Sequence, residues 1–208
     1  MLINIVSWIA VAAILAASVG LLLNRDWRWS LGLLAAQYLA AFWLVTLHWP
    51  IGLASVKLVS GWMGIAALGM TRLSLSGEEE AAKPFRPPRL GFHLFLAGIV
   101  VLLTAAAAAR IESILPGLGL PVVAGSLLLI GMGLMHLSIT SQILRVILGL
   151  LTILSGFEIM YAAVEGSILV AGLLAVINLG LALVGSFLLV SEFEGSDDLS
   201  HRDGEQLA

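Results

Sequence analysis

The sequence predicts an all-α polytopic membrane protein with seven transmembrane helices, on the evidence of its composition and of its long apolar runs. Hydrophobic residues make up 60% of the 208 positions and charged residues only 11%, whereas soluble domains carry roughly 25% charged residues. The apolar runs are continuous, and they do not alternate with polar residues as the strands of a membrane barrel would. We therefore predict that every span is a helix.

Seven apolar runs have about the 17–25 residues that a helix needs to cross the hydrocarbon core of a bilayer. They fall at roughly 2–23, 29–48, 51–70, 91–109, 121–140, 144–164 and 167–190. The first run has no basic residue before it and no small-residue cleavage site, so we expect a retained span rather than a signal peptide. Each run is predicted to form one transmembrane helix.

The segments between the runs carry residues that commonly interrupt helices. In chain order they are 24–29, 48–50, the polar loop 71–90, the segment 116–121 with a proline at each end, 138–142 and 165–167. The loop 71–90 contains Glu78 to Glu80 and a basic, proline-rich stretch, and residues 191–208 are acidic. Neither segment has much apolar surface to bury. We therefore expect a single transmembrane domain at 1–190, with a cytoplasmic loop at 71–90, and a flexible acidic C-terminal tail at 191–208.

Basic residues predict how these helices are oriented. If the spans alternate in direction, Arg110 lies on one side of the membrane and eight basic residues lie on the other: Arg25, Arg28, Arg72, Lys83, Arg86, Arg89, Arg145 and Arg202. Cytoplasmic loops carry an excess of Lys and Arg. We therefore expect the N-terminus outside and the C-terminus in the cytoplasm, in a multi-pass protein of the inner (plasma) membrane. The same bias favours an odd number of spans.

The sequence also excludes several classes of function. Cysteine is absent, which rules out disulfides, thiolate metal sites and redox dithiols. There is no nucleophile elbow, P-loop, HExxH motif or dinucleotide fingerprint, and the histidines lack metal-ligand spacing. The charges leave no footprint for nucleic acid. We expect no catalytic residue, cofactor or metal, and a chain whose surroundings are the lipid bilayer.

Two charged residues lie inside predicted spans at matching depths. Lys57 and Glu158 are each about six residues from the outer end of their run, so both lie roughly 9 Å deep. A lone charge near a helix centre costs about 2.5–3.5 kcal/mol on insertion scales, and pairing relieves part of that cost. We therefore predict a Lys57–Glu158 interaction, with snorkelling of Lys57 to the interface as the alternative. For Glu158 a transport role and a purely structural role both remain open.

Other polar residues extend this pattern. Ser155, Glu158 and Glu165 fall on one stripe of a helix, which predicts a polar track opening outward. Asn178 and Gln37 lie near the middle of their spans, where amide side chains usually form hydrogen bonds between helices.

Small residues occur at helical spacing in three of the spans, where they allow helix backbones to approach closely. They are Ala12, Ala16 and Gly20 in the first span, Gly52, Gly61 and Gly64 in the third, and Ala171, Ala175, Asn178, Ala182 and Gly185 in the last. These faces are predicted to pack, either against one another or against partners.

The segment around Glu158 resembles a known family. Gly156-Phe-Glu158-Ile-Met160 looks like the Gly-x-Glu-Ile-Met segment of NADH-quinone oxidoreductase subunit K. The longer pattern that opens with Gln142-Ile-Leu-Arg145 is similar to hydrogenase-4 component E, a seven-helix relative of that subunit, in which a Gln-containing helix and a Lys-containing helix precede a polar loop. Gln37 and Lys57 match that order here. The resemblance covers roughly residues 28–73 and 140–190.

The resemblance implies a small, non-catalytic accessory subunit of a respiratory or hydrogenase-type complex that moves protons or sodium ions, bound beside antiporter-like membrane subunits. Glu158 would act as a relay, with Lys57 modulating its proton affinity. The chain departs from the family in two places: Asn178 stands near the second acidic position, and alignment on Arg145 puts Leu154 at the component E carboxylate. The alternative function is a self-contained seven-helix binding or transport protein.

Overall fold

The computed structural model describes residues 2–24, 26–75 and 90–206, with side chains for 2–24, 26–75 and 91–195. These residues form seven helices: α1 (Leu2–Leu23), α2 (Trp27–Thr46), α3 (Ile51–Leu75), α4 (Leu90–Ile114), α5 (Leu120–Ile139), α6 (Ile143–Val164) and α7 (Ile168–Gln206). Each of them contains a stretch long and apolar enough to cross a membrane. The prediction of an all-α chain with seven such helices is confirmed in the described part of the chain.

Helix ends differ from the predicted runs where the helix continues into polar sequence. α2 begins at Trp27 because the Asp26 side chain accepts a hydrogen bond from the Arg28 backbone N–H and caps the helix. α3 extends to Leu75 and α4 to Ile114, each about five residues past the apolar run. Helical backbone groups bond within the helix, so polar residues outside the bilayer can extend it. Most of the predicted loop 71–90 lies outside the described residues.

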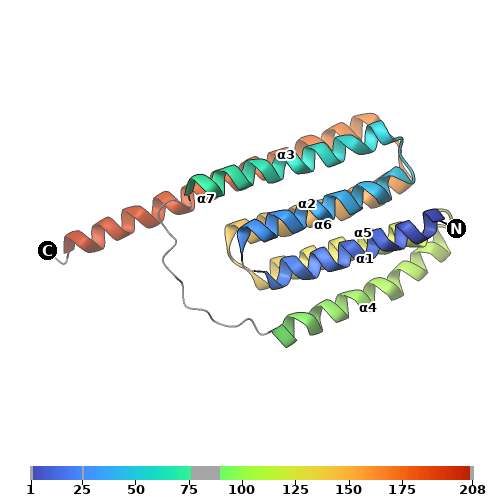
Figure 1. Cartoon of the computed structure of the whole chain (residues 1–208), viewed down its shortest axis with the longest axis horizontal. Coiled ribbons are helices and arrows are strands. Elements are labelled where there is room, and N and C mark those ends of the chain that lie inside the picture. The colour runs from blue at the N-terminus through green and yellow to red at the C-terminus, as the bar shows by residue number, and fades with distance from the viewer. Residues whose placement is uncertain (1, 25, 76–89, 207–208) are drawn as a thin grey trace.

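The C-terminal tail is helical over most of its length, and its flexibility stays a prediction. The sequence predicts a flexible segment from residue 191, and the backbone of α7 is helical without a break from Ile168 to Gln206. Figure 1 shows this extension projecting past the other helices. Hydropathy marks only the part of a helix that lies in lipid, and it carries no information on where the helix ends in water.

The helices form two facing rows of three with one helix at the edge (Figure 1). The helices α1, α2 and α3 make one row, and α5, α6 and α7 make the other. Each member of a row packs on its counterpart, α1 on α5, α2 on α6 and α3 on α7, while α4 packs mainly on α5. Within this arrangement α2, α3, α7 and α6 form a closed four-helix unit. Each of these helices packs on the next, and α6 packs on α2. Across the described residues, the unit's diagonal pairs α3–α6 and α2–α7 make no direct backbone packing.

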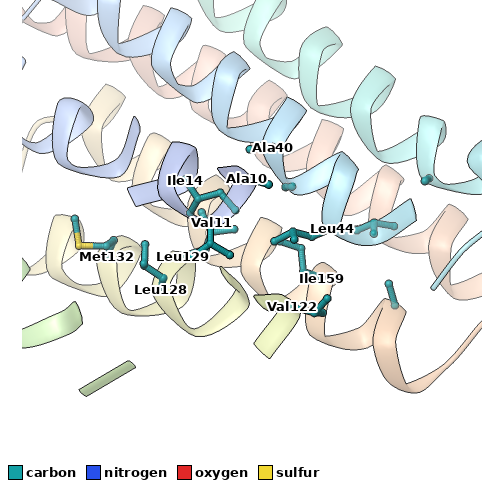
Figure 2. Close-up of a cluster of buried hydrophobic side chains, with 14 of the residues drawn as sticks. Ala10, Val11, Ile14, Ala40, Leu44, Val122, Leu128, Leu129, Met132 and Ile159 are labelled. Atoms are coloured by element: carbon teal, nitrogen blue, oxygen red, sulfur yellow. The ribbon is translucent and has the colours of Figure 1, made fainter. Parts of the chain in front are cut away.

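Apolar side chains fill the space between the rows. Figure 2 shows one cluster, in which Ile14 from α1, Leu44 from α2, Leu129 from α5 and Ile159 from α6 point toward one another. All four are fully buried. A second cluster, from α1, α2, α3, α6 and α7, includes Leu34, Leu68, Leu148, Leu151 and Ala182. Because lipid tails are as apolar as these side chains, close packing rather than escape from water holds them together.

Glycines set the closest helix contacts. A Cβ on Gly156 of α6 would lie 2.6 Å from the Ser126 carbonyl oxygen of α5, and a Cβ on Gly133 of α5 would lie 2.9 Å from the Gly149 carbonyl oxygen of α6. Between α3 and α7, a Cβ on Gly64 would lie 2.9 Å from the Ala182 Cβ. The predicted small-residue stripe of α7 is thus a packed face, whereas the glycines that join α5 to α6 were not among the predicted stripes.

The α5–α6 contact gives a direct test of this packing. We expect Gly156→Ala to destabilise the protein by about 1–3 kcal/mol, because the new methyl group meets backbone that cannot move aside. Thermal unfolding in mild detergent measures the effect. Gly172→Ala on α7 is the matched control, since nothing lies within 4 Å of its added Cβ, and alanine favours a helix over glycine by about 1 kcal/mol. Equal melting temperatures for the two variants would contradict the α5–α6 contact.

Candidate functional site

The two charged residues of the spans meet inside the four-helix unit. Lys57 lies two turns into α3 and Glu158 lies two turns before the end of α6, and they are 6% and 5% exposed. The Lys57 ammonium donates hydrogen bonds to Glu158 Oε2 and, at 3.1 Å, to Ser155 Oγ. The predicted contact is therefore present, and Lys57 points into the bundle rather than toward an interface.

This ion pair bridges a diagonal of the unit. The backbones of α3 and α6 do not approach each other closely in the described residues, and the long Lys57 side chain spans the distance between them. Breaking a buried pair leaves an uncompensated charge, which typically costs about 3–5 kcal/mol. The hydroxyl of Ser155, one turn before Glu158, supplies a second acceptor for the ammonium. The pair therefore fixes the orientation of α6 relative to α3.

Tyr38 crosses the same space along the other diagonal. Its hydroxyl donates to Asn178 Oδ1 at 2.7 Å, joining α2 to α7. The Lys57 ammonium lies 5.2 Å from the centre of the Tyr38 ring, where the negative face of the ring attracts a cation. Gly61 makes room for this ring, because a Cβ there would lie 2.3 Å from Tyr38 Cδ1. Tyr38 was not among the residues predicted from the sequence, where its only signal is a hydroxyl in mid-span beside Gln37.

Gln37, the residue before Tyr38 in α2, forms a separate set of hydrogen bonds. Its amide nitrogen donates to Ser18 Oγ on α1 at 2.7 Å, and its amide oxygen accepts from Thr152 Oγ1 on α6 at 3.3 Å. Thr152 lies one turn before Ser155 on the buried face of α6, so this set adjoins the ion pair along the helix. Gln37 joins three helices, as expected of an intramembrane amide.

The remaining predicted residues have different positions. Asn178 is 1% exposed, and its Nδ2 has no hydrogen-bond partner among the described residues. Glu165 is exposed at the end of α6, where its backbone carbonyl accepts a 2.8 Å hydrogen bond from Trp49 Nε1. The structure thus brings Glu158, Lys57 and, through Tyr38, Asn178 together. It places the Glu165 carboxylate outside this cluster, two turns away along α6.

A small cavity, partly open at the surface of the bundle, adjoins the ion pair. It is lined by Lys57 and Glu158 and otherwise by apolar or aromatic side chains, namely Trp49, Leu53, Val56, Ala171, Leu174 and Ala175. The space open to the centre of a water molecule is ≈ 10 Å³, about the room for one water. The cavity lies toward the end of the bundle that is formed by the α2–α3 and α6–α7 turns.

Comparisons with other proteins leave the site to be interpreted from its own chemistry. No family model, curated protein or solved structure matches this chain. Among the described residues no group of three or more His, Asp or Glu side chains is placed to hold a metal ion. What the arrangement offers chemically is one buried carboxylate, one buried ammonium and the hydroxyl and amide groups around them.

A double-mutant cycle tests the ion pair. We expect Lys57→Met and Glu158→Gln each to lower stability, the first by about 3–5 kcal/mol because it leaves the carboxylate unpaired. The double variant should lose less than the sum of the two, since it leaves no buried charge. Thermal unfolding in mild detergent measures all three, with Val59→Met, on an exposed position of α3, as the control. Additive losses would show that the two residues do not interact.

Proposed function

We propose that this chain is a small accessory subunit of a proton- or sodium-translocating membrane complex of the respiratory or hydrogenase type, and that Glu158 supports ion translocation. The observation that carries the proposal is the buried Lys57–Glu158 pair at the centre of the four-helix unit. Ionisable residues inside a membrane are expensive to place there and commonly mark ion pathways.

The chemistry of the pair suits a relay. A carboxylate can take up and release a proton, and a neighbouring ammonium compensates its charge between these events. The ammonium is shared between Glu158 and Ser155, so it keeps a partner when the carboxylate is neutral. In this proposal Asn178 and Gln37 hold the helices around the pair in register, and the exposed Glu165 carboxylate attracts cations at the end of α6.

The environment of the protein is part of the proposal. Its seven apolar helices indicate a multi-pass membrane protein, and we propose the inner (plasma) membrane. The distribution of basic residues supports an N-terminus outside and a C-terminus in the cytoplasm. The turns beside the cavity then face outward.

Partners are proposed on two grounds. The resemblance around Glu158 to subunits that lie beside antiporter-like proteins supports hydrophobic membrane subunits as partners. In addition, the surface of α4 carries large exposed side chains, among them Phe95, Leu102 and Leu103, and a surface of this kind is stable only against lipid or another membrane subunit.

The experiment compares Glu158→Gln with wild type in native membranes. We expect the variant, although less stable, still to assemble, because the Lys57 ammonium keeps its hydrogen bond to Ser155. Respiration-driven proton or sodium uptake into inverted vesicles, normalised to the amount of assembled complex on native gels, should fall by about tenfold or more, as loss of a proton-transfer group causes. Glu192→Gln, on an exposed position of α7, is the matched control and should leave uptake unchanged.

Two results would count against the proposal. One is normal ion uptake by an assembled complex that carries Glu158→Gln. The other is purification of the chain in mild detergent as a homo-oligomer without other membrane subunits, which would favour a self-contained binding or transport protein.

A further inference from the structure

The cavity beside the ion pair has an unused donor and an unused acceptor. Of the three N–H donors of the Lys57 ammonium, one bonds Ser155 and one bonds Glu158. The Glu158 carboxylate uses Oε2 in that contact, and no hydrogen bond to its Oε1 is present within the described residues. Both residues line the cavity. The cavity therefore holds the hydrogen-bonding groups that a single water needs to be stable there.

The chemistry of the lining selects water over other occupants. Apart from the charged pair, the lining consists of apolar and aromatic side chains, which offer nothing to orient a polar solute. The helices α3, α6 and α7 are unbroken beside the cavity, so their carbonyls are used within the helices and not exposed as ion ligands. The volume is too small for an organic molecule.

Trp49 separates this cavity from the end of the bundle. It lies in the α2–α3 turn, where its backbone N–H donates to the Val45 carbonyl at 2.9 Å, and its side chain is 7% exposed. On the α6 side its indole N–H donates to the Glu165 carbonyl, and its ring meets the edge of Tyr161 with ring centres 6.3 Å apart. The indole is thereby held across the gap between the α2–α3 and α6–α7 turns.

We infer that the cavity is a water site bound to Lys57 and Glu158, and that Trp49 closes it toward the solvent at the end of the bundle formed by the α2–α3 and α6–α7 turns. Release of the indole from the Glu165 carbonyl joins this water to the solvent at that end of the bundle. The inference deepens the proposed function, because it names the route by which a proton would reach Glu158. The biological role of this route rests on the proposed function. It concerns access alone, so access can be tested without any ion pumping.

Cysteine accessibility is the test, since the chain has no native cysteine. Ala175→Cys puts a thiol in the cavity wall, and Val176→Cys puts one on the lipid-facing side of α7, 66% exposed, one residue further along. A cationic, membrane-impermeant methanethiosulfonate is applied to the full chain in cells or sealed vesicles. It reacts only with a hydrated thiolate.

Replacing Trp49 by Ala should raise the reaction rate of Ala175→Cys by about tenfold or more, because the thiol then meets water, and should leave Val176→Cys unreactive. Trp49→Phe keeps an aromatic ring but loses the hydrogen bond to Glu165, and should raise the rate by less. This milder variant carries the test if Trp49→Ala does not fold, with Leu174→Cys as a second reporter in the cavity wall.

An unchanged rate in every Trp49 variant, or an equal rise at Val176→Cys, would overturn the inference. The two proposals fail separately. Labelling that responds to Trp49, together with normal ion uptake in Glu158→Gln, would leave the water entrance standing and remove the ion-translocating role. Labelling that does not respond to Trp49, together with reduced ion uptake in Glu158→Gln, would leave the ion-translocating role standing and remove the water entrance.

Discussion

The buried ion pair between Lys57 and Glu158 is the constraint on which the inner architecture depends. Charges so far from water are tolerated only when each has the other and further hydrogen bonds within reach. Here the pair spans α3 and α6, which are diagonal in the four-helix unit and whose backbones make no close contact within the described residues. The surrounding helices must therefore leave a shared central space while still excluding lipid. The Tyr38–Asn178 bond crosses that space along the other diagonal and places an aromatic face beside the ammonium.

Small residues make this arrangement possible by deciding how closely the helices approach. Gly61 leaves the volume that the Tyr38 ring occupies, and Gly64 faces Ala182 between α3 and α7. Because these helices approach closely, the polar cluster fills the space between them, and the adjoining cavity has room for about one water. At the end of the cavity, Trp49 is held by its hydrogen bond to the Glu165 carbonyl and by its contact with Tyr161.

Hydropathy could predict the seven helices because crossing a bilayer requires long apolar runs in any sequence. The contact between Lys57 and Glu158 was also predictable from the sequence, because the two residues lie at matching depths in their spans and a buried charge needs a partner. Hydropathy could not predict Tyr38 as their neighbour, because that depends on which helices lie side by side and on the space at Gly61. Glu165 shows the limit of helical periodicity: it shares a stripe with Glu158, but α6 ends at Val164 and the carboxylate is exposed. The continuation of α7 to Gln206 was equally beyond a pattern that registers only lipid-facing sequence.

Every functional role proposed for this chain requires the Lys57 ammonium to contact the Glu158 carboxylate within the bilayer. Solid-state NMR in lipid can measure this contact as the dipolar coupling between ¹⁵N at lysine Nζ and ¹³C at the glutamate carboxyl group. The chain has two lysines, Lys57 and Lys83, so a Lys83→Arg variant leaves a single labelled ammonium. The account predicts a strong coupling, as expected for an N···O separation within about 4 Å, and its loss in Glu158→Gln. An uncoupled Lys57 signal with the mobility of an interfacial side chain would contradict it.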